Sequence, residues 1–508
     1  MSDIVVVGAG SAGAVIASRL SEDPAIAVTL LEAGPARVPR ESRIPAAFSR
    51  LFRGPFDWRF ETEPETELGG RRLYWPRGRM MGGSSAMNAM IWTRPAREDF
   101  ARWVAAGAAG WSYPELEPCF ARAELPDDRG GPIGIPIGPL RSPSPLVAPF
   151  LSACAALGLP PNDGFGDGRI EGAGAFRVTQ RRGARVSTGT GYLDPARGRS
   201  NLAVESGAVV DRVVFERNRA VGVRYLDANG HSRLARGRVV LSAGAIGSPT
   251  ILLRSGVGPA SQLGTLGIDV AADLPGVGAN LQDHLACGRV YRLRRPVSLA
   301  GAGGTVDLVQ YLFARRGRLT SNVAEAGAFF SLGDAPVPML EVLLGAAYFV
   351  DHGFANPEGH GMTLAIVLQH PESRGRVTLR SATPGDPPVI EARYLSAPAD
   401  RERLLEGLGW VQELAATAPL AAEHRGEALE RRSADAHLRG LAQTLYHPVG
   451  TCRIGVGPDA VVGADLRVRG CEDLWVADAS VIPLIPTGHT HAPSVVIGER
   501  AAVLIRQA

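Results

Sequence analysis

The chain has 508 residues, which is more than one ordinary hydrophobic core holds and predicts two domains. Hydrophobic residues make up 45% and charged residues 21%, a balance typical of globular proteins. The formal net charge of +3 is too small to indicate nucleic acid or a membrane surface as a partner, and all 54 basic residues are arginine.

The five cysteines are too scattered to predict a disulfide framework or a zinc site, because none forms a Cys-x-x-Cys pair or a cluster with histidine. This usage is typical of a reducing compartment, so we expect a cytoplasmic protein. The N-terminus has no basic segment before its short apolar run, which we interpret as a strand and not as a signal peptide. No stretch of about 18 apolar residues predicts a transmembrane helix.

A strand, a glycine-rich turn and a helix open the chain. Residues 3–7 are rich in β-branched side chains, Gly-Ala-Gly-Ser-Ala-Gly follows at residues 8–13, and residues 14–20 predict a helix. A second strand at residues 28–31 ends on Glu32, an acid placed to bind the hydroxyls of a ribose. This is the βαβ pattern of dinucleotide-binding proteins, and by itself it leaves FAD and NAD(P) both open.

Each glycine of that turn has a physical role. Gly8 permits the tight turn, Gly10 lets backbone approach a pyrophosphate, and Gly13 lets helix and strand pack closely. The phosphates are expected at the helix N-terminus, where free N–H groups favour anions. Small residues are equally dense at 76–88, 238–249 and 276–284, and they predict further places where backbone approaches a flat ligand.

Residues 296–440 differ in character, because strand-like runs alternate there with loops and a helical stretch at 400–418. The chain then returns to glycine-rich loops, a strand at 473–478 and an amphipathic closing helix. We therefore predict an α/β fold, α+β overall. A Rossmann-like domain would comprise residues 1–145, 186–295 and 441–508, and an interleaved antiparallel-sheet substrate-binding domain residues 146–185 and 296–440. Residues 202–214 and 220–225 are expected to pair as strands, and 126–145 to form a connector.

Three histidines, His447, His489 and His491, lie among glycines and prolines near the C-terminus. One histidine in a loop is usually a surface or satisfied core residue, but three of them after a nucleotide-binding chain favour proton transfer at a site. The aromatic residues concentrated at 36–70 are interpreted as a packed cover loop in preference to direct substrate contacts.

Several motifs together resemble the glucose–methanol–choline oxidoreductases, and the choline dehydrogenase and choline oxidase branch in particular. They span nearly the whole chain: VVVGAGSAGAVIASRL with Glu32, RGRMMGGSSAMNAMIW, LSAGAIGSPTILLRSGVGP, LPGVGANLQDH, TSNVAEAGAF, YHPVGTC, VADASVIP and GHTHAPSVVIGERAA.

The resemblance implies that the cofactor is FAD. The residues that would bind it are Gly8, Gly10, Ser11, Ala12, Gly13, Glu32, Ala33, Met81, Gly83, Asn88, Ala89, Met90, Ile91, Val210, Ala243, Asp478, Ala479, His489, Thr490 and His491. Where choline oxidase carries a histidine covalently bonded to the flavin, this sequence has Met87, so we expect non-covalent FAD.

The resemblance also implies the catalytic residues. His447 of YHPVGTC would be the base, and His489, eleven positions after Asp478, would face it. The choline-oxidising branch typically has Asn at the latter position, which leaves the substrate open. Glu325, His370 and Tyr446 would contact substrate, with a structural carboxylate as the alternative interpretation of Glu325.

The expected reaction is oxidation of a primary alcohol to an aldehyde by hydride transfer to flavin N5, with oxygen or another acceptor reoxidising the flavin. Besides the alcohol and the acceptor, no nucleic acid or metal is expected as a partner, no transmembrane segment is expected in the chain, and a homodimer stays open. The alternative is a flavoprotein of this fold without net alcohol oxidation, such as a hydroxynitrile lyase.

Overall fold

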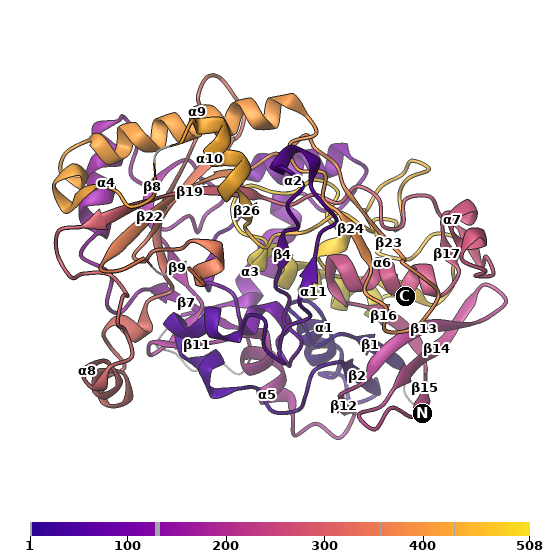
Figure 1. Cartoon of the computed structure of the whole chain (residues 1–508). Helices are drawn as coiled ribbons and strands as arrows, with labels where there is room; N and C mark the ends of the chain where they lie inside the picture. Colours follow the sequence, from indigo (N-terminus) through magenta and orange to yellow (C-terminus); the bar gives the residue numbers. More distant parts are fainter. Residues whose placement is uncertain (1–2, 127–132, 356, 431) are drawn as a thin grey trace.

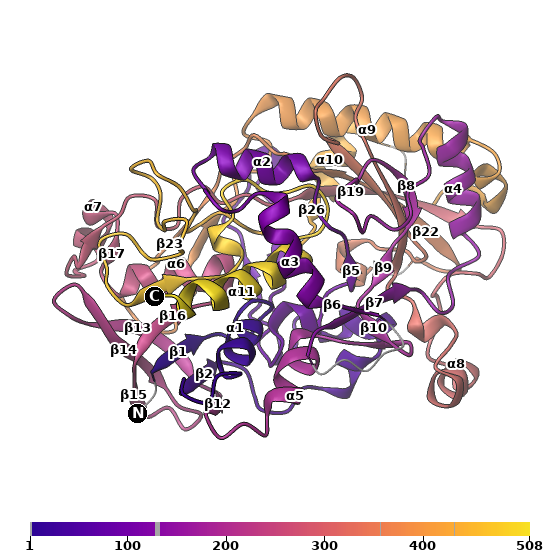
Figure 2. The same ribbon diagram turned by 180° about the vertical axis from the view of Figure 1, so that it is seen from behind.

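The computed structural model describes residues 3–126, 133–355, 357–430 and 432–508. Two sheets dominate it (Figures 1 and 2). The first is a five-stranded parallel sheet, whose strands in spatial order are β12 (Leu202–Ser206), β2 (Val28–Glu32), β1 (Ile4–Val7), β16 (Arg238–Leu241) and β27 (Leu474–Val476). Because β27 comes from the end of the chain, the parallel sheet is complete only when the C-terminal segment has joined it.

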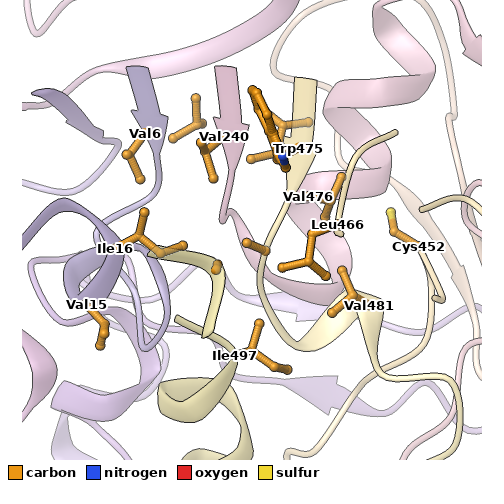
Figure 3. Close-up of a cluster of buried hydrophobic side chains, with 14 of the residues drawn as sticks. Val6, Val15, Ile16, Val240, Cys452, Leu466, Trp475, Val476, Val481 and Ile497 are labelled. Carbon is orange, nitrogen blue, oxygen red and sulfur yellow. The ribbon is translucent and has the colours of Figure 1, made fainter. Parts of the chain in front are cut away.

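Apolar side chains from both ends of the chain pack on this sheet. Helix α1 (Gly13–Leu20) follows β1, and helix α11 (His491–Arg506) lies against it. Figure 3 shows Val6 and Val240 on the strands facing Ile16 of α1 and Ile497 of α11, all of them fully or almost fully buried. Burying such side chains is the main favourable contribution to folding, at about 1.5–3 kcal/mol each.

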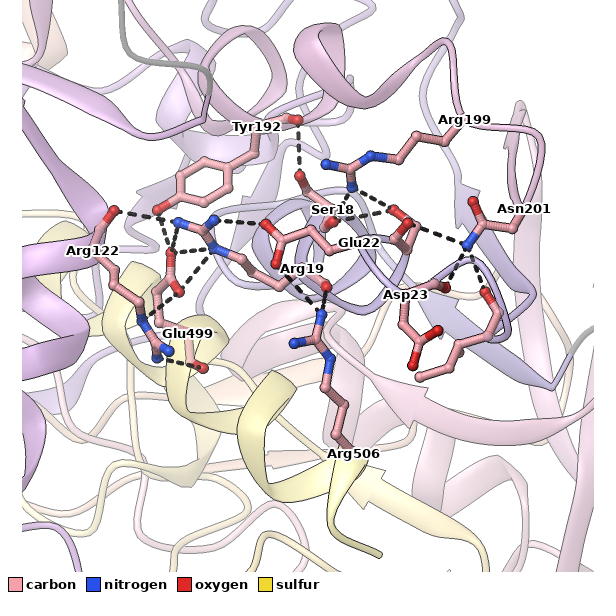
Figure 4. A network of polar contacts seen from close by, with 12 residues as sticks. Ser18, Arg19, Glu22, Asp23, Arg122, Tyr192, Arg199, Asn201, Glu499 and Arg506 are labelled. Atoms are coloured by element: carbon pink, nitrogen blue, oxygen red, sulfur yellow. Dashed lines mark hydrogen bonds and ion pairs between the residues drawn. The ribbon is translucent and has the colours of Figure 1, made fainter.

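A buried polar network ties the same helices together (Figure 4). Arg19 of α1 donates from Nε and Nη2 to the carboxylate of Glu499 on α11, at 3.0 and 2.9 Å, and Tyr192 donates to it at 2.8 Å. Glu499 is buried, so its charge needs these partners. The network therefore fixes the C-terminal helix, and with it the histidine loop that precedes it.

The second sheet is antiparallel and has seven strands. In order they are β25 (His424–Glu427), β19 (Leu285–Leu293), β22 (Gly361–Leu368), β21 (Leu340–Gly345), β20 (Ala324–Phe330) and β8 (Gly172–Ala175), with β26 (Gln443–Thr444) pairing beside β25 on β19. Helices α9 (Pro398–Ala416) and α4 (Val147–Ala156) cover one face. The opposite face looks toward the parallel sheet, and strand alternation places Glu341 and Leu343 on it.

Smaller elements complete the fold. The strands are β3 (Phe60–Glu61), β4 (Tyr74–Trp75), β5 (Ile91–Trp92), β6 (Glu124–Pro126), β7 (Ile135–Pro139), β9 (Arg177–Val178), β10 (Gln180–Arg181), β11 (Ala184–Arg185), β13 (Val209–Glu216), β14 (Arg219–Leu226), β15 (Ser232–Arg236), β17 (Val257–Gly258), β18 (Ala272–Asp273), β23 (Arg376–Thr378) and β24 (Val389–Glu391). The helices are α2 (Arg97–Ala105), α3 (Tyr113–Ala123), α5 (Asp194–Ala196), α6 (Gly244–Arg254), α7 (Ala260–Thr265), α8 (Thr305–Val309) and α10 (Ala434–Leu441).

The α/β class with a Rossmann-like sheet and an antiparallel sheet is confirmed, and the structure differs from the sequence expectations in three local details. Residues 202–214 are two strands: β12 joins the parallel sheet, and β13 pairs with β14 after a turn. Strand β19 belongs to the antiparallel sheet, so the chain crosses into it before Leu285 and not at residue 295. The expected connector 126–145 contains strand β7, while its residues 127–132 lie outside the described part of the chain.

Candidate active site

A cavity of about 690 Å³ lies between the two sheets. Its size falls within the roughly 300–1,000 Å³ common for cofactor and small-molecule sites. One end is lined by the first glycine turn and by Glu32, and the other by strands of the antiparallel sheet and by the three C-terminal histidines.

The nucleotide end is shaped by close backbone contacts. A Cβ at Gly13 would lie 1.9 Å from the carbonyl oxygen of Gly8, so only glycine fits there. A Cβ at Gly10 would meet no atom within 4 Å, so this backbone faces open space. Glu32 accepts hydrogen bonds from the N–H groups of Ala9 at 2.9 Å and Gly34 at 2.8 Å, and burial raises its pKa to about 7.

Most of the residues expected to bind the cofactor line this cavity. They are Gly8, Gly10, Ser11, Ala12, Glu32, Ala33, Gly83, Asn88, Ala89, Met90, Ile91, Val210, Ala243, Asp478, Ala479, His489, Thr490 and His491. Gly13 and Met81 do not line it: Gly13 packs against the cavity-lining Gly8, and Met81 is buried in the core under the parallel sheet.

His447 is joined to a second histidine, His284, whose Nδ1 lies 2.9 Å from Nδ1 of His447. The Nε2 of His284 is 2.9 Å from the carbonyl oxygen of Gln369, which only accepts, so this Nε2 carries the proton. Burial lowers the pKa of His284 to about 3, so its Nδ1 is a bare acceptor for the Nδ1–H of His447. This assignment leaves Nε2 of His447 unprotonated. Burial and the neighbouring His284 hold the pKa of His447 well below its usual value.

His489 has a different partner. Its Nε2 lies 3.0 Å from a carboxylate oxygen of Glu341, and the second oxygen of Glu341 accepts from the side-chain amide of Gln369 at 3.0 Å. The rings of His447 and His489 are 5.1 Å apart and nearly perpendicular. Gln369 therefore connects the supports of both histidines, through its backbone carbonyl on one side and its side chain on the other.

His491 is buried and lines the cavity, and neither ring nitrogen has a hydrogen-bond partner among the described residues. Its ring packs edge-on against Trp92, with centroids 5.5 Å apart. Burial lowers its pKa to about 3. A buried polar group without a partner is costly, so this one is suited to meeting a bound ligand.

Of the three expected substrate residues, only Tyr446 lines the cavity. Glu325 is buried away from it, and its two oxygens accept from the N–H of Ser144 and the hydroxyl of Ser321. His370 also lies outside the lining. Its Nδ1 is 2.9 Å from Arg102, and its Nε2 is 3.0 Å from the hydroxyl of Thr487. Both residues have the contacts of structural groups, because their polar atoms are taken up by neighbouring protein.

Sequence reasoning missed His284, Glu341 and Gln369. A signal existed for Glu341, which is the one charged residue in the apolar run 339–344. The aromatic segment 36–70 was interpreted as a cover, yet it contributes to the cavity wall through Phe48, Phe52, Trp58 and Phe60. An irregular segment shows no period in its sequence from which inward and outward residues could be told apart.

The sequence matches the family models described as GMC oxidoreductase, over residues 2–286 and 371–498. The chain belongs to the GMC oxidoreductase family. It is 45% identical to an uncharacterized GMC-type oxidoreductase of Mycobacterium tuberculosis over 99% of both chains. Identity is 37% to an alcohol dehydrogenase [acceptor] of Pseudomonas putida, over 99% of this chain and 96% of that one, and 38% to human mitochondrial choline dehydrogenase, over 99% and 89%.

The fold matches that of pyridoxine 4-oxidase from Mesorbium loti, with a TM-score of 0.91, 34% identity and full coverage of both chains. Family membership makes this GMC oxidoreductase an enzyme acting on CH–OH donors, with FAD as its cofactor. The residues present fit that cofactor, because the open backbone at Gly10 and the ring nitrogens of His491, which have no hydrogen-bond partner among the described residues, lie along one cavity. Within the described residues, no helix is long and apolar enough to cross a membrane.

Proposed function

We propose that this GMC oxidoreductase oxidises a primary alcohol to an aldehyde, with His447 as the base and His489 as its partner. The supporting observation is the chain from the carbonyl of Gln369 through His284 to His447, since it leaves a lone pair on Nε2 of His447. A general base needs such a lone pair at the cavity, and His447 lines the cavity.

Bound FAD would supply the two-electron acceptor for the hydride of the substrate carbon. His447 takes the hydroxyl proton at Nε2, and the alkoxide character that develops makes hydride loss easier. Glu341 holds Nε2 of His489, so Nδ1 is the ring nitrogen left for the substrate oxygen. Both rings are held by buried partners, which keeps the two groups oriented before the alcohol binds.

The favoured substrate is a neutral alcohol with an apolar body. The strands of the antiparallel sheet contribute a wall of small and apolar residues without a charged side chain among them: Ala286, Gly288, Ala324, Leu343, Gly345, Thr363 and Ala365. Phe48, Phe52 and Phe349 add aromatic surface to the cavity. The same rings also suit a quaternary ammonium such as choline through cation–π attraction, although Glu325 offers it no carboxylate there.

An anaerobic panel of aromatic, long-chain and cationic alcohols tests this assignment. We expect the flavin absorption to bleach with a primary aromatic or aliphatic alcohol faster than with choline, and an oxygen-uptake trace then separates oxidase from dehydrogenase. Faster bleaching with choline would reverse the substrate preference. No bleaching across a broad panel, with release of cyanide from a cyanohydrin, would support the lyase alternative.

We further propose that FAD is held without a covalent bond. Met87 lines the cavity at the position where choline oxidase has its flavin-linked histidine, and a thioether offers no ring nitrogen for that linkage. After acid precipitation the yellow colour should stay in the supernatant, and a flavin that remains with the pellet would contradict this proposal.

A further inference from the structure

A helical segment projects from the body of the molecule. It consists of α8 (Thr305–Val309) and a π-helical turn at Gln310–Ala314, and both ribbon views show α8 standing away from the two sheets (Figures 1 and 2). We call residues 305–314 the apolar projection. Its large apolar side chains are exposed: Val306 by 71%, Leu312 by 61% and Phe313 by 86%, together with Leu308 and Val309.

Two buried residues one helical turn apart hold the apolar projection in place. Asp307 accepts from the guanidinium of Arg318 at 2.9 and 2.7 Å, and from the N–H of Gly303 at 3.0 Å. Tyr311 donates its hydroxyl to the carbonyl of Arg43 at 3.0 Å. Because Asp307 and Tyr311 face the protein, the apolar side chains between and after them face outward. The exposure is therefore built into an ordered, anchored segment.

Arginines surround the apolar projection. Arg315 and Arg316 follow it directly, and both are exposed. The hairpin of β10 and β11 packs on the same turn, because a Cβ at Gly183 would lie 2.7 Å from the carbonyl oxygen of Arg315, and this hairpin carries two further exposed arginines. Two more exposed arginines, Arg43 and Arg50, lie on the segment whose Arg43 carbonyl accepts the hydrogen bond from Tyr311. The six exposed arginines are Arg43, Arg50, Arg181, Arg182, Arg315 and Arg316.

None of these six arginines forms an ion pair with a carboxylate in the described part of the chain, while Asp307 is already neutralised by Arg318. The local surface is thus an apolar tip beside these six arginines, here called the cationic ring, with Glu41 as an exposed carboxylate on the Arg43 segment. The formal net charge of +3 gives no sign of this cationic surface, because acidic residues elsewhere in the chain offset these arginines.

We propose that the apolar projection docks this enzyme on an anionic lipid surface. Apolar side chains would enter the boundary between headgroups and acyl chains, and the arginines would contact the phosphates, as for interfacial amphipathic segments. Self-association through this face is disfavoured, since a two-fold interface would bury two copies of the same net cationic surface against each other. The 3-10 segment Pro45–Leu51 connects this face to the active site, because it carries both Arg50 and the cavity-lining Phe48.

Sedimentation of the holoenzyme with vesicles tests this proposal. We expect binding to vesicles of phosphatidylcholine mixed with phosphatidylglycerol, much weaker binding to phosphatidylcholine alone, and release as salt is raised. The double variant Leu312→Ser/Phe313→Ser should lower the partition coefficient by about tenfold or more. Each substitution removes the favourable free energy of moving an apolar side chain from water into the lipid. Val456→Ser, at a site 80% exposed on another loop, is the matched control and should bind as wild type does.

The charged ring has its own variants. Arg315→Ala/Arg316→Ala should weaken binding and flatten its salt dependence, whereas the exposed Arg425→Ala should change neither. Absence of binding to both vesicle types would overturn the proposal, as would undiminished binding by the Leu312/Phe313 variant. Concentration-dependent dimerisation that Phe313→Ser abolishes, without vesicle binding, would assign the surface to a second copy.

Discussion

The Nδ1 atom of His447, which lines the cavity, lies 2.9 Å from Nδ1 of the buried His284 behind it. Two identical atoms in such a contact must play opposite roles, one donating and one accepting. The carbonyl of Gln369 on the far side of His284 decides the direction, because it takes the only proton of the neutral His284 ring. His284 is thereby a positioning residue, which sets the tautomer of the proposed base.

Replacing His284 by leucine should slow anaerobic flavin reduction by about tenfold to hundredfold, because an unpaired buried Nδ1–H costs roughly 1–3 kcal/mol and favours the other tautomer. Asparagine at this position retains an acceptor and should recover part of the rate. His437→Leu is the control, since His437 is also buried and bonded to a backbone carbonyl but, unlike His284, has no hydrogen bond to His447. Equal rate losses in His284→Leu and His437→Leu would show that His284 is merely structural.

His447→Ala and His491→Ala should have unequal effects. Removing the base should cost about a hundredfold or more in the rate of flavin bleaching, with the flavin-to-protein absorbance ratio kept. His491→Ala should have the smaller effect on rate, because Nε2 of His447 stays in place. Small and equal effects of the two substitutions would refute the assignment of His447 as base.

The pH profile follows from the lowered pKa of His447. A base must be neutral to accept a proton, and a pKa below the ordinary 6.5 keeps it neutral throughout the neutral range. We expect kcat/KM to be flat from about pH 6.5 upward to pH 8, with its acid limb below that range. Steady-state rates across that range measure it, and an acid limb above pH 7 would contradict the burial effect.

Glu325→Gln should affect stability more than substrate binding. The substitution weakens charge-assisted hydrogen bonds from Ser144 and Ser321, so we expect urea unfolding to show a loss of about 1–3 kcal/mol. The KM for choline and for aromatic alcohols should stay unchanged, because Glu325 does not line the cavity. Tyr446→Phe, a change within the lining, serves as the comparison and should alter KM. A choline-specific rise in KM for Glu325→Gln would restore the substrate role.

The sequence alone determined the nucleotide end of the site. Strand β1, the glycine turn and helix α1 are contiguous, and the close contact that requires Gly13 is with the carbonyl of Gly8, five residues earlier. The close contact at Gly8 is with the distant Ser242, but the glycine spacing of the turn already predicted it. The histidines 447, 489 and 491 were also identifiable from their glycine- and proline-rich setting, which places His447 and His489 in loops, whereas His491 begins helix α11.

Only the tertiary structure decided how those histidines are supported and what lies on the surface. His284 and Glu341 are separated from their partners by 163 and 148 residues, so no local pattern connects them. Glu325 and Glu341 both interrupt apolar strands, and only the pairing of those strands sends one carboxylate to the serines and the other to His489. The cationic ring arises in the same way, because packing brings together arginines that are far apart along the chain. The net charge of the whole chain gives no information on which charges lie close together.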